Sequence, residues 1–200
     1  MPTILVVCTG NICRSPTAAA FLRGALERRF GPGAFEVRSA GTMAWEGSPS
    51  PPEAIAAGAE LGIDLSGHQA RALTHGMVEE GDLVVTMARE HRDAIHRAVP
   101  AAVGRTFTLR ELIFLLEQLP PALGPDEEGF FARIADADRL RAFTRRPRRE
   151  ADVLDPLGGG PQEYRRAAGE IRDLVERLVA ALWGPPAGRA AGRRAGSGWG

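Results

Sequence analysis

The nine residues from Cys8 to Pro16 constrain this chain more than any other stretch. They read Cys-Thr-Gly-Asn-Ile-Cys-Arg-Ser-Pro and lie between a short apolar run at residues 4–7 and an amphipathic segment that begins at Thr17. Ser15 is typical of a helix N-cap, and Pro16 is typical of the first helical position. The pattern therefore predicts a buried strand, a tight turn and a helix in direct succession.

Such a turn is suited to binding a phosphate. It leaves successive backbone N–H groups unpaired and points a helix N-terminus at them, and Gly10 and Asn11 tolerate left-handed backbone. A thiol at Cys8 and a guanidinium at Arg14 add the means to attack phosphorus and to hold two of its oxygens. The residues expected to surround the phosphate are Thr9, Gly10, Asn11, Ile12, Cys13, Arg14 and Ser15. We refer to residues 8–15 as the 8–15 loop.

Other phosphate-binding loops fit this sequence poorly. A nucleotide-binding P-loop requires a lysine, and the chain contains none. A dinucleotide fingerprint requires three spaced glycines, and this stretch has only Gly10. The remaining alternative is that Cys8 and Cys13 are small buried hydrophobic residues beside an ordinary strand end. The arginine, asparagine and serine at fixed spacings favour the phosphate loop.

The composition narrows the class of protein. Two hundred residues predict a single domain with a substantial core. The 25 basic residues balance 25 acidic ones, so net charge indicates neither a nucleic-acid nor a membrane partner. Two cysteines in one turn are too few for a secreted disulfide framework or a zinc site, and no run approaches the about 20 apolar residues of a membrane span. We therefore expect a cytoplasmic protein.

Strands and helices are expected to alternate along the chain. Short apolar strands are predicted at residues 3–7, 35–39 and 83–87, with a fourth that ends near Phe107. The predicted fold is α/β: a small doubly wound sheet of four parallel strands with helices on both faces, in which the phosphate loop follows the first strand.

Several helix boundaries are also expected from the sequence. Capping boxes are predicted at residues 50–53 and 108–111, and shorter helices at residues 74–80 and 89–99. Apolar residues that recur every three or four positions predict a long amphipathic helix over residues 164–182.

The segment from residue 120 to residue 150 is predicted to be an insertion that contains one helix, over residues 127–143. Its arginines have two interpretations: a solvated face paired with nearby acidic residues, which we favour, or steering of an anionic substrate. Residues 184–200 hold too little apolar surface to become ordered. A single folded domain is thus expected to span residues 1–183, followed by a disordered tail.

Asp155 is the candidate proton donor. A thiolate that attacks a phosphate ester needs an acid for the departing oxygen, and this acid must come from elsewhere in the fold. Pro156 restricts the backbone on its N-terminal side and would present the carboxyl group of Asp155 at a fixed angle. Taken alone, an Asp-Pro pair often only starts a turn.

Considered together, these features make residues 2–183 resemble the low-molecular-weight protein tyrosine phosphatase family. That family has a Cys-x-Gly-Asn-x-Cys-Arg-Ser loop near its N-terminus and an acid in a late Asp-Pro. Further matches lie at residues 37–42, at residues 62–66 with His68, and at residues 107–112.

The resemblance implies a role for each residue of the site. Cys8 would be the nucleophile, Arg14 the phosphate clamp, and Asp155 the general acid and then the base for the water that hydrolyses the cysteinyl-phosphate. It implies no metal or organic cofactor. The residues that would hold the loop in shape by hydrogen bonds are Asn11, Ser15, Ser39 and His68. For His68 the alternative is a turn histidine that caps the local backbone.

Substrate recognition is where the chain departs from the family pattern. The family normally has an aromatic residue after Asp-Pro, and here Leu157 stands in that place. Trp45 matches an aromatic residue of the family and would form the opposite wall of the substrate slot, or else would cover the edge of the core. The protein-arginine phosphatases of the family carry threonine where this chain has Ile12, so the aliphatic residue favours phosphotyrosine.

The sequence therefore predicts a cysteine-dependent phosphatase that hydrolyses phosphotyrosine on proteins and acts as a monomer or weak dimer. The alternatives are a protein-arginine phosphatase and a catalytically slow module that binds phosphoproteins or anions. Arsenate reductases of the same fold need further cysteines, and this chain has none outside the loop. We also expect Cys13 to form a reversible disulfide with Cys8 on oxidation.

Overall fold

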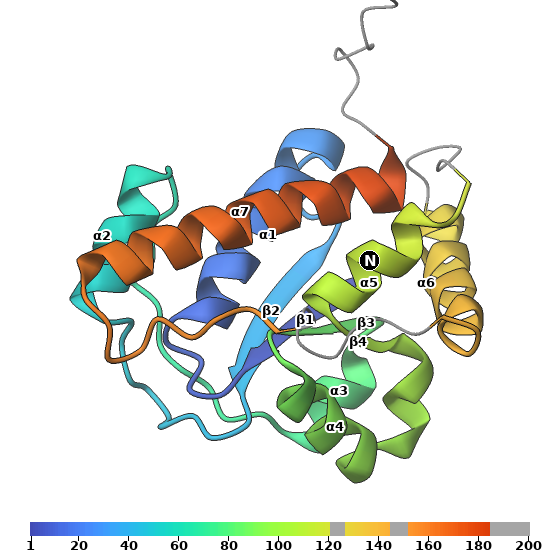
Figure 1. The fold of residues 1–200 in the computed structure, drawn as a ribbon, viewed down its shortest axis with the longest axis horizontal. Helices are drawn as coiled ribbons and strands as arrows, with labels where there is room; N and C mark the ends of the chain where they lie inside the picture. Colours follow the sequence, from blue (N-terminus) through green and yellow to red (C-terminus); the bar gives the residue numbers. More distant parts are fainter. Residues whose placement is uncertain (121–126, 145–151, 185–200) are drawn as a thin grey trace, which may run out of the picture.

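The computed structural model describes residues 1–120, 127–144 and 152–184 of the chain. Four parallel strands form its sheet in the order β2-β1-β3-β4 (Figure 1). Their bounds are Thr3–Cys8 for β1, Glu36–Gly41 for β2, Leu83–Thr86 for β3 and Thr106–Thr108 for β4. The predicted α/β architecture is confirmed, and the central position of β1 places the 8–15 loop in the middle of the carboxyl edge of the sheet.

Seven α-helices and one 3₁₀-helix connect and extend the strands in the described residues. Their bounds are Arg14–Phe30 for α1, Pro52–Glu60 for α2, His75–Glu80 for α3, Arg89–Ala98 for α4, Pro100–Arg105 for the 3₁₀-helix, Leu109–Glu117 for α5, Glu127–Arg141 for α6 and Pro161–Trp183 for α7. Helix α7 crosses one layer of the molecule against α1 and α5, while α3 and α4 lie on the opposite side of the sheet (Figure 1). Helices therefore cover both faces, as the parallel sheet requires.

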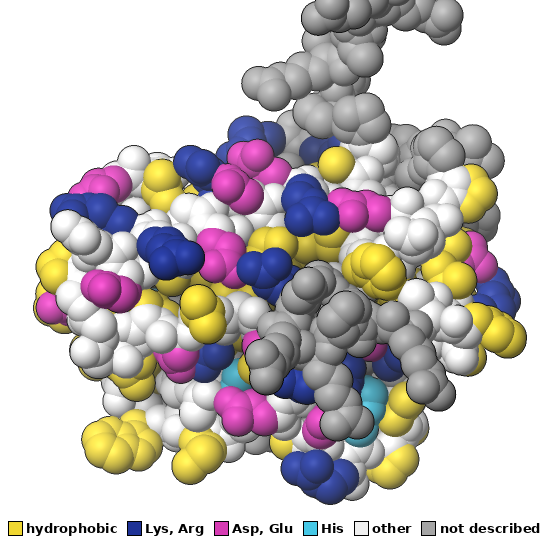
Figure 2. Space-filling view, in the orientation of Figure 1, with side chains coloured by type: hydrophobic (Ala, Val, Ile, Leu, Met, Phe, Trp, Pro, Cys, Tyr) yellow, Lys and Arg dark blue, Asp and Glu magenta, His cyan; other side chains and the backbone are white. Residues whose placement is uncertain are grey.

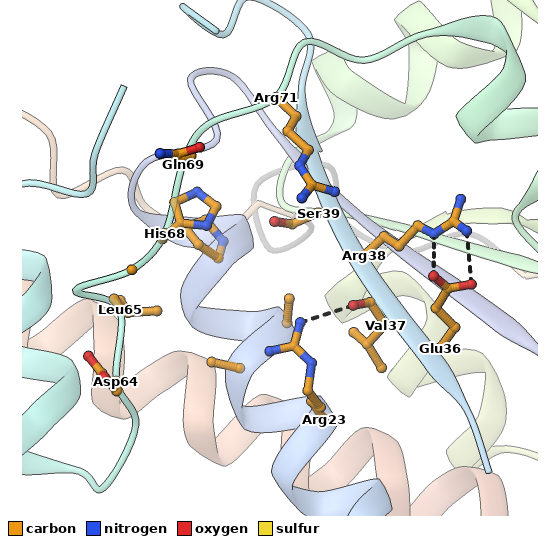
Figure 3. Close-up of a pocket in the computed structure, with 14 residues that line it drawn as sticks. Arg23, Glu36, Val37, Arg38, Ser39, Asp64, Leu65, His68, Gln69 and Arg71 are labelled. Atoms are coloured by element: carbon orange, nitrogen blue, oxygen red, sulfur yellow. Dashed lines mark hydrogen bonds and ion pairs between the residues drawn. The ribbon is translucent and has the colours of Figure 1, made fainter. Parts of the chain in front are cut away.

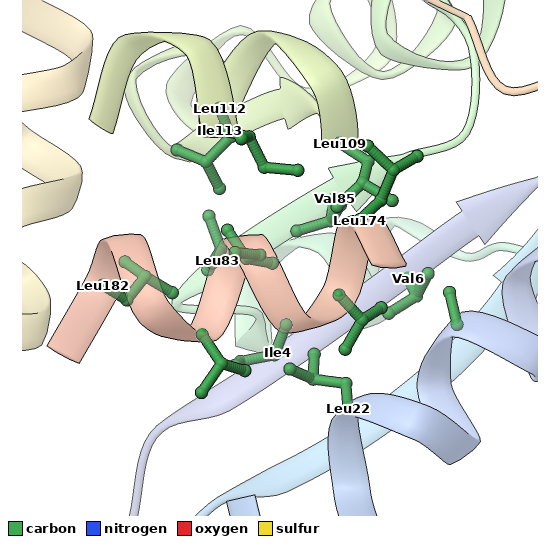
Figure 4. Packing of buried hydrophobic residues seen from close by; sticks show 14 of the residues in the cluster. Ile4, Val6, Leu22, Leu83, Val85, Leu109, Leu112, Ile113, Leu174 and Leu182 are labelled. Atoms are coloured by element: carbon green, nitrogen blue, oxygen red, sulfur yellow. The ribbon is translucent and has the colours of Figure 1, made fainter. Parts of the chain in front are cut away.

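The alternation of β1 divides the core into two clusters. Ile4 and Val6 point into the larger cluster beneath α1, α5 and α7 (Figure 4), whereas Leu5 and Val7 point into the smaller one beneath α3 and α4. All four side chains are buried. Since neighbouring residues of a strand face opposite sides, the apolar run at residues 4–7 of β1 anchors both layers of helices and fixes where the 8–15 loop begins.

The segment predicted as an insertion contributes to the core. Phe130 of α6 is fully buried, and its ring stacks on Trp183 of α7 with centroids 5.6 Å apart. Phe35 packs edge-on against both rings. The sequence places the helix correctly, but its mixed charge hides the apolar residues that pack it onto the domain.

The arginines of α6 behave in two ways. Arg139 pairs with Asp136 on the surface, as expected of a solvated face. Arg141 instead packs its guanidinium over the ring of Phe107, 3.8 Å from the centroid, and also pairs with Asp138. Burial lowers the pKa of Arg141. The arginines within residues 145–149, which the sequence analysis also assigned to a solvated face, lie outside the described residues. The tail after Gly184 lies outside them as well.

Two predicted helix caps are wrong, and a third is confirmed. Helix α1 begins at Arg14, so Ser15 lies in its first turn and uses its hydroxyl elsewhere. Helix α2 begins at Pro52 because Pro51, which precedes a proline, is held extended with ψ at 147°. The predicted serine cap at Ser50 thus has no helical N–H to bind, and its buried Oγ has no partner among the described residues. The capping box that begins at Thr108 is present.

The exposed surface carries both charges in alternation. Figure 2 shows arginine and acidic side chains interspersed along the outer face of α7. Arg165 pairs with Glu60 of α2, and Arg177 pairs with Glu117 of α5. In the described parts of the chain, no helix is both long and apolar enough to cross a membrane.

We predict that Phe130→Ala lowers the free energy of unfolding by about 3–5 kcal/mol, because it opens a cavity beneath Trp183. Phe143→Ala is the matched control, since that ring is 88% exposed. Chemical denaturation of both variants checks this. Equal stability of the two variants would show that α6 does not belong to the cooperative core.

Candidate active site

The 8–15 loop wraps around the sulfur of Cys8. This side chain ends β1 and is buried. Its Sγ lies 3.0 Å from Oγ of Ser15, and the backbone N–H of Asn11 donates to it at 3.3 Å. These contacts, together with the N-terminus of α1, stabilise negative charge on the sulfur. The sulfur thus lies inside the 8–15 loop, with a hydroxyl and one backbone N–H directed at it.

Asn11 is the structural centre of the loop. It is fully buried and adopts left-handed backbone with φ at 54°. Its Nδ2 donates to Oγ of Ser15 and to Oγ of Ser39, both at 2.9 Å. Its Oδ1 accepts from the backbone N–H of Arg71 at 2.8 Å, and its carbonyl oxygen lies 2.6 Å from Nε2 of His68. The side chain is therefore held from β2 and from the segment around residue 70.

The structure brings together the residues predicted to support the loop. Ser39 and His68 both contact Asn11, so His68 does not simply cap its own turn. Burial lowers the pKa of His68, and the nearby charges of Arg71 and Arg23 lower it further. The imidazole is therefore neutral near pH 7, and its Nε2–H can donate to the carbonyl oxygen of Asn11.

A glycine allows the loop to approach the end of β2. A Cβ built on Gly41 would lie 2.5 Å from the carbonyl oxygen of Thr9 and 2.9 Å from the backbone nitrogen of Asn11. Real Cβ atoms do not approach backbone so closely. Gly41 thus accounts for one of the sequence matches beyond the loop itself, at residues 37–42.

Arg14 connects the loop to the predicted acid. Its guanidinium is buried and donates to the carbonyl oxygen of Val153 at 3.2 Å and to Oγ1 of Thr9 at 3.1 Å. It also forms an ion pair with Oδ2 of Asp155, whose side chain is 38% exposed. The late Asp-Pro segment thus lies against the 8–15 loop, although 139 residues or more separate them in sequence.

The segment that carries Asp155 is fixed at two further points. The backbone N–H of Val153 donates to the carbonyl oxygen of Met87 at 2.7 Å, just beyond β3. Asp152 accepts from Arg89 at the start of α4. Burial alone would raise the pKa of Asp152, but the hydrogen bonds from Arg89 outweigh it and lower this pKa. These contacts hold the carboxyl group of Asp155 at the mouth of the loop.

His91 is a residue of the site that the sequence analysis missed. It lies in the first turn of α4, is 2% exposed, and places Nε2 2.9 Å from Oγ1 of Thr9. Thr9 in turn accepts from Arg14, so His91 supports the guanidinium indirectly. Burial lowers the pKa of His91, and the charge of Arg14 lowers it further. The one available signal was its position in the turn that follows β3, at the same sheet edge as the loop.

The two cysteines occupy different environments. Cys13 packs with Ala54, Ala57 and Tyr164 in a small cluster behind the loop. Burial, with a contribution from the charge of Asp155, raises the pKa of Cys13 to about 12. Cys13 therefore stays a thiol at neutral pH, which distinguishes it from a nucleophile. Both cysteines are free, and the predicted disulfide between them stays a prediction.

The predicted substrate walls lie on the surface. Trp45 is 85% exposed and Leu157 is 58% exposed, so Trp45 does not cover the edge of the core. Ile12 is partly buried and packs against the cluster around Cys13. Among the described residues, no three side chains of His, Cys, Asp or Glu are grouped so that they could hold a metal ion.

Comparison with known proteins agrees with this geometry. Residues 3–119 match the model of the low molecular weight phosphotyrosine protein phosphatases. A probable low molecular weight protein-tyrosine-phosphatase, EpsP of Ralstonia solanacearum, is 44% identical over 110 residues, which are 55% of this chain and 72% of that protein. A protein-arginine-phosphatase of Geobacillus stearothermophilus is 33% identical over 179 residues, 90% of this chain and 95% of that protein.

The solved structures extend the similarity to nearly the whole fold. The crystal structure of a YwlE mutant from Bacillus subtilis superposes with a TM-score of 0.68 at 28% identity, and the match covers 91% of this chain and 99% of that one. The alignment therefore extends beyond residue 119, where the match to the family model ends.

We predict that the free energy of unfolding falls as pH decreases from about pH 7 to about pH 5. The fold lowers the pKa of His91 and keeps its imidazole neutral, whereas in the unfolded chain a histidine binds a proton below about pH 6.5. The contribution of His91 to stability is therefore fully present above about pH 6.5 and is lost as the pH falls below it. His91→Asn is expected to make the loss shallower, as thermal unfolding across this pH range will show. Exposed His75→Asn is the control, and an unchanged slope in His91→Asn would contradict the prediction.

Proposed function

Because the chain belongs to the low molecular weight phosphotyrosine protein phosphatase family, we propose that it hydrolyses phosphotyrosine on proteins through a phosphorylated Cys8. The observation that carries the proposal is the meeting of three groups at one loop: the Cys8 sulfur, the Arg14 guanidinium and the Asp155 carboxyl group. These groups supply a nucleophile, a charge clamp and a proton donor.

The first step would transfer the phosphoryl group to the enzyme. The loop N–H groups bind the phosphate oxygens. Arg14 gives up its ion pair with Asp155 and donates hydrogen bonds to two of these oxygens. The Cys8 thiolate attacks phosphorus, the bond from phosphorus to the tyrosine oxygen breaks, and Asp155 gives its proton to that oxygen. The tyrosine side chain leaves neutral, and the phosphoryl group remains on sulfur.

The second step would release phosphate. The Asp155 carboxylate takes a proton from a water molecule while the oxygen of that water attacks phosphorus. The bond from phosphorus to sulfur then breaks. The thiolate of Cys8 is restored, and Ser15 and the Asn11 N–H stabilise it as a leaving group. Each residue of this cycle is present in the chain, and no metal or organic cofactor is required.

A second candidate, protein-arginine phosphatase, is favoured by a specific finding. The arginine phosphatase of Geobacillus stearothermophilus aligns with 90% of this chain, whereas the tyrosine phosphatase EpsP aligns with 55%. Ile12 supports the tyrosine assignment, because an aliphatic side chain suits an aromatic ring and offers no hydrogen bond to a phosphorylated guanidinium. The exposed ring of Trp45 supports it as well.

The setting of the reaction follows from the same chemistry. A thiolate nucleophile works only while it is reduced, and both cysteines are free in the fold. We therefore propose that the enzyme works in the cytoplasm. We also propose that its substrate is a phosphoprotein and that it acts as a monomer or weak dimer. The extent of the catalytic domain, residues 1–183, is part of the same proposal.

The first test is hydrolysis of an aryl phosphate between about pH 5 and about pH 7 without added metal. Cys8→Ser is expected to abolish turnover, and Asp155→Ala to lower kcat by about 10²–10⁴. Cys13→Ser should keep most of the activity. Asp173→Ala removes an exposed carboxylate of α7 that pairs with Arg172, and is expected to act like the wild type.

This series also separates the enzyme from a binding module. If the wild type binds phosphate or vanadate without turnover, the chain is an anion-binding protein. If Asp155→Ala changes only the affinity for the aryl phosphate and not kcat, Asp155 is not the acid.

We predict that Ile12→Thr shifts activity from phosphotyrosine peptides toward phosphoarginine peptides, because a hydroxyl offers a hydrogen bond to a phosphorylated guanidinium that the aliphatic side chain does not. Wild type and variant should be compared by kcat/KM on both peptides, with Ile12→Val as the control that keeps an apolar side chain. A wild type that already prefers phosphoarginine would favour the second candidate.

A further inference from the structure

A separate cavity of about 490 Å³ lies between α1, the edge strand β2 and the segment 64–71 (Figure 3). None of the residues that line it belongs to the 8–15 loop or to the Asp155 segment. The reaction proposed above therefore gives this cavity no role. Its volume falls within the range of sites for small molecules, about 300–1,000 Å³.

Two guanidinium groups that pair with no carboxylate of the described residues give the cavity an excess of positive charge. The side chain of Arg71 makes no hydrogen bond or ion pair with the described residues. One nitrogen of the Arg23 guanidinium donates to the carbonyl oxygen of Val37 at 3.0 Å. Arg38 is different, because Glu36 and Glu80 hold it in ion pairs. Figure 3 shows the Arg23 and Arg71 side chains directed into the space between β2 and His68.

The other groups of the cavity suit a small polar anion. His68, Ser39 and Gln69 bring further hydrogen-bonding groups to its walls, and Ala19 and Leu65 supply apolar surface. Asp64 is the one lining acid without an arginine partner among the described residues; it is exposed and accepts from the backbone N–H of Ser66. The pKa of His68 is lowered by burial and then by Arg71 and Arg23, which agrees with both guanidinium groups lying near the imidazole.

The walls of this cavity are also the supports of the 8–15 loop. His68 contacts the carbonyl oxygen of Asn11, Ser39 accepts from its Nδ2, and the backbone N–H of Arg71 donates to its Oδ1. The N–H of Asn11 in turn donates to the sulfur of Cys8. The wall residues His68, Ser39 and Arg71 are thus two contacts away from the sulfur of Cys8.

We propose that this cavity is a second anion site, which binds a small molecule with two or more carboxylate or phosphate groups and is coupled to the 8–15 loop through Asn11. Arg23 and Arg71 hold the anionic groups, and Ser39 or Gln69 bind a hydroxyl of the ligand. Binding fixes the segment around His68 and Arg71 and so orders the contacts that keep Asn11 left-handed. This goes beyond the proposed reaction and does not depend on which phosphoresidue the enzyme cleaves.

Binding is tested by calorimetric titration of the full chain after Cys8 is alkylated with iodoacetate, which fills the 8–15 loop covalently. Citrate and fructose 1,6-bisphosphate are the two probes, and binding of either one supports the site and tells carboxylate from phosphate recognition. The double variant Arg23→Met, Arg71→Met is expected to weaken binding at least about tenfold, since each lost charge-assisted hydrogen bond has that order of effect. Arg28→Met, on the same helix but outside the cavity, should bind like the wild type.

Coupling is tested on the unmodified enzyme with an aryl phosphate as substrate. The bound probe is expected to raise kcat/KM severalfold in the wild type and in Arg28→Met. The double arginine variant is expected to lose this increase. Any competition between the probe and the aryl phosphate for the 8–15 loop would be the same in this variant as in the wild type. Absence of binding by both probes to the alkylated protein would overturn the site. Equal responses of the wild type and the double variant would overturn the coupling, whatever the phosphoresidue specificity proves to be.

Discussion

The hydrogen bonds of one buried amide, that of Asn11, connect the 8–15 loop to the rest of the fold. A non-glycine residue in left-handed backbone is unfavourable unless its surroundings hold it there. Here Ser15, Ser39, His68 and the backbone of Arg71 all contact Asn11. This conformation directs its N–H toward the sulfur of Cys8. The geometry of the nucleophile therefore depends on residues that are distant in sequence and belong to different elements.

The buried guanidinium of Arg14 makes the second long-range connection. It joins the 8–15 loop to Val153 and Asp155, and Thr9 and His91 hold it from the other side. A buried charge is costly unless it is fully paired, so these contacts are needed for stability as well as for chemistry. In the proposed reaction Arg14 gives up its ion pair with Asp155 in order to bind phosphate, and the carboxyl group becomes available to the leaving oxygen.

Sequence reasoning succeeded where the signal is local. The strand before Cys8, the capping box at Thr108 and the long helix α7 are each set by a few neighbouring residues, and the structure places them as predicted. It failed where a contact that forms only in the folded chain decides the outcome. Serine is common at helix N-caps, yet the hydroxyl of Ser15 contacts Cys8 and Asn11. His91 belongs to no motif and can be identified only once Thr9 lies beside it, and Phe130 meets Trp183 across 53 residues of sequence.

The most direct measurement is to identify the residue that carries phosphate during turnover. Asp155→Ala enzyme, in which hydrolysis of the intermediate is slowed, should be mixed with a phosphotyrosine peptide, quenched in acid, digested and analysed by mass spectrometry. The account predicts a phosphate on Cys8, and none when Cys8→Ala is combined with Asp155→Ala. A phosphate on His91 or on Cys13, or turnover without any phosphorylated residue, would contradict it.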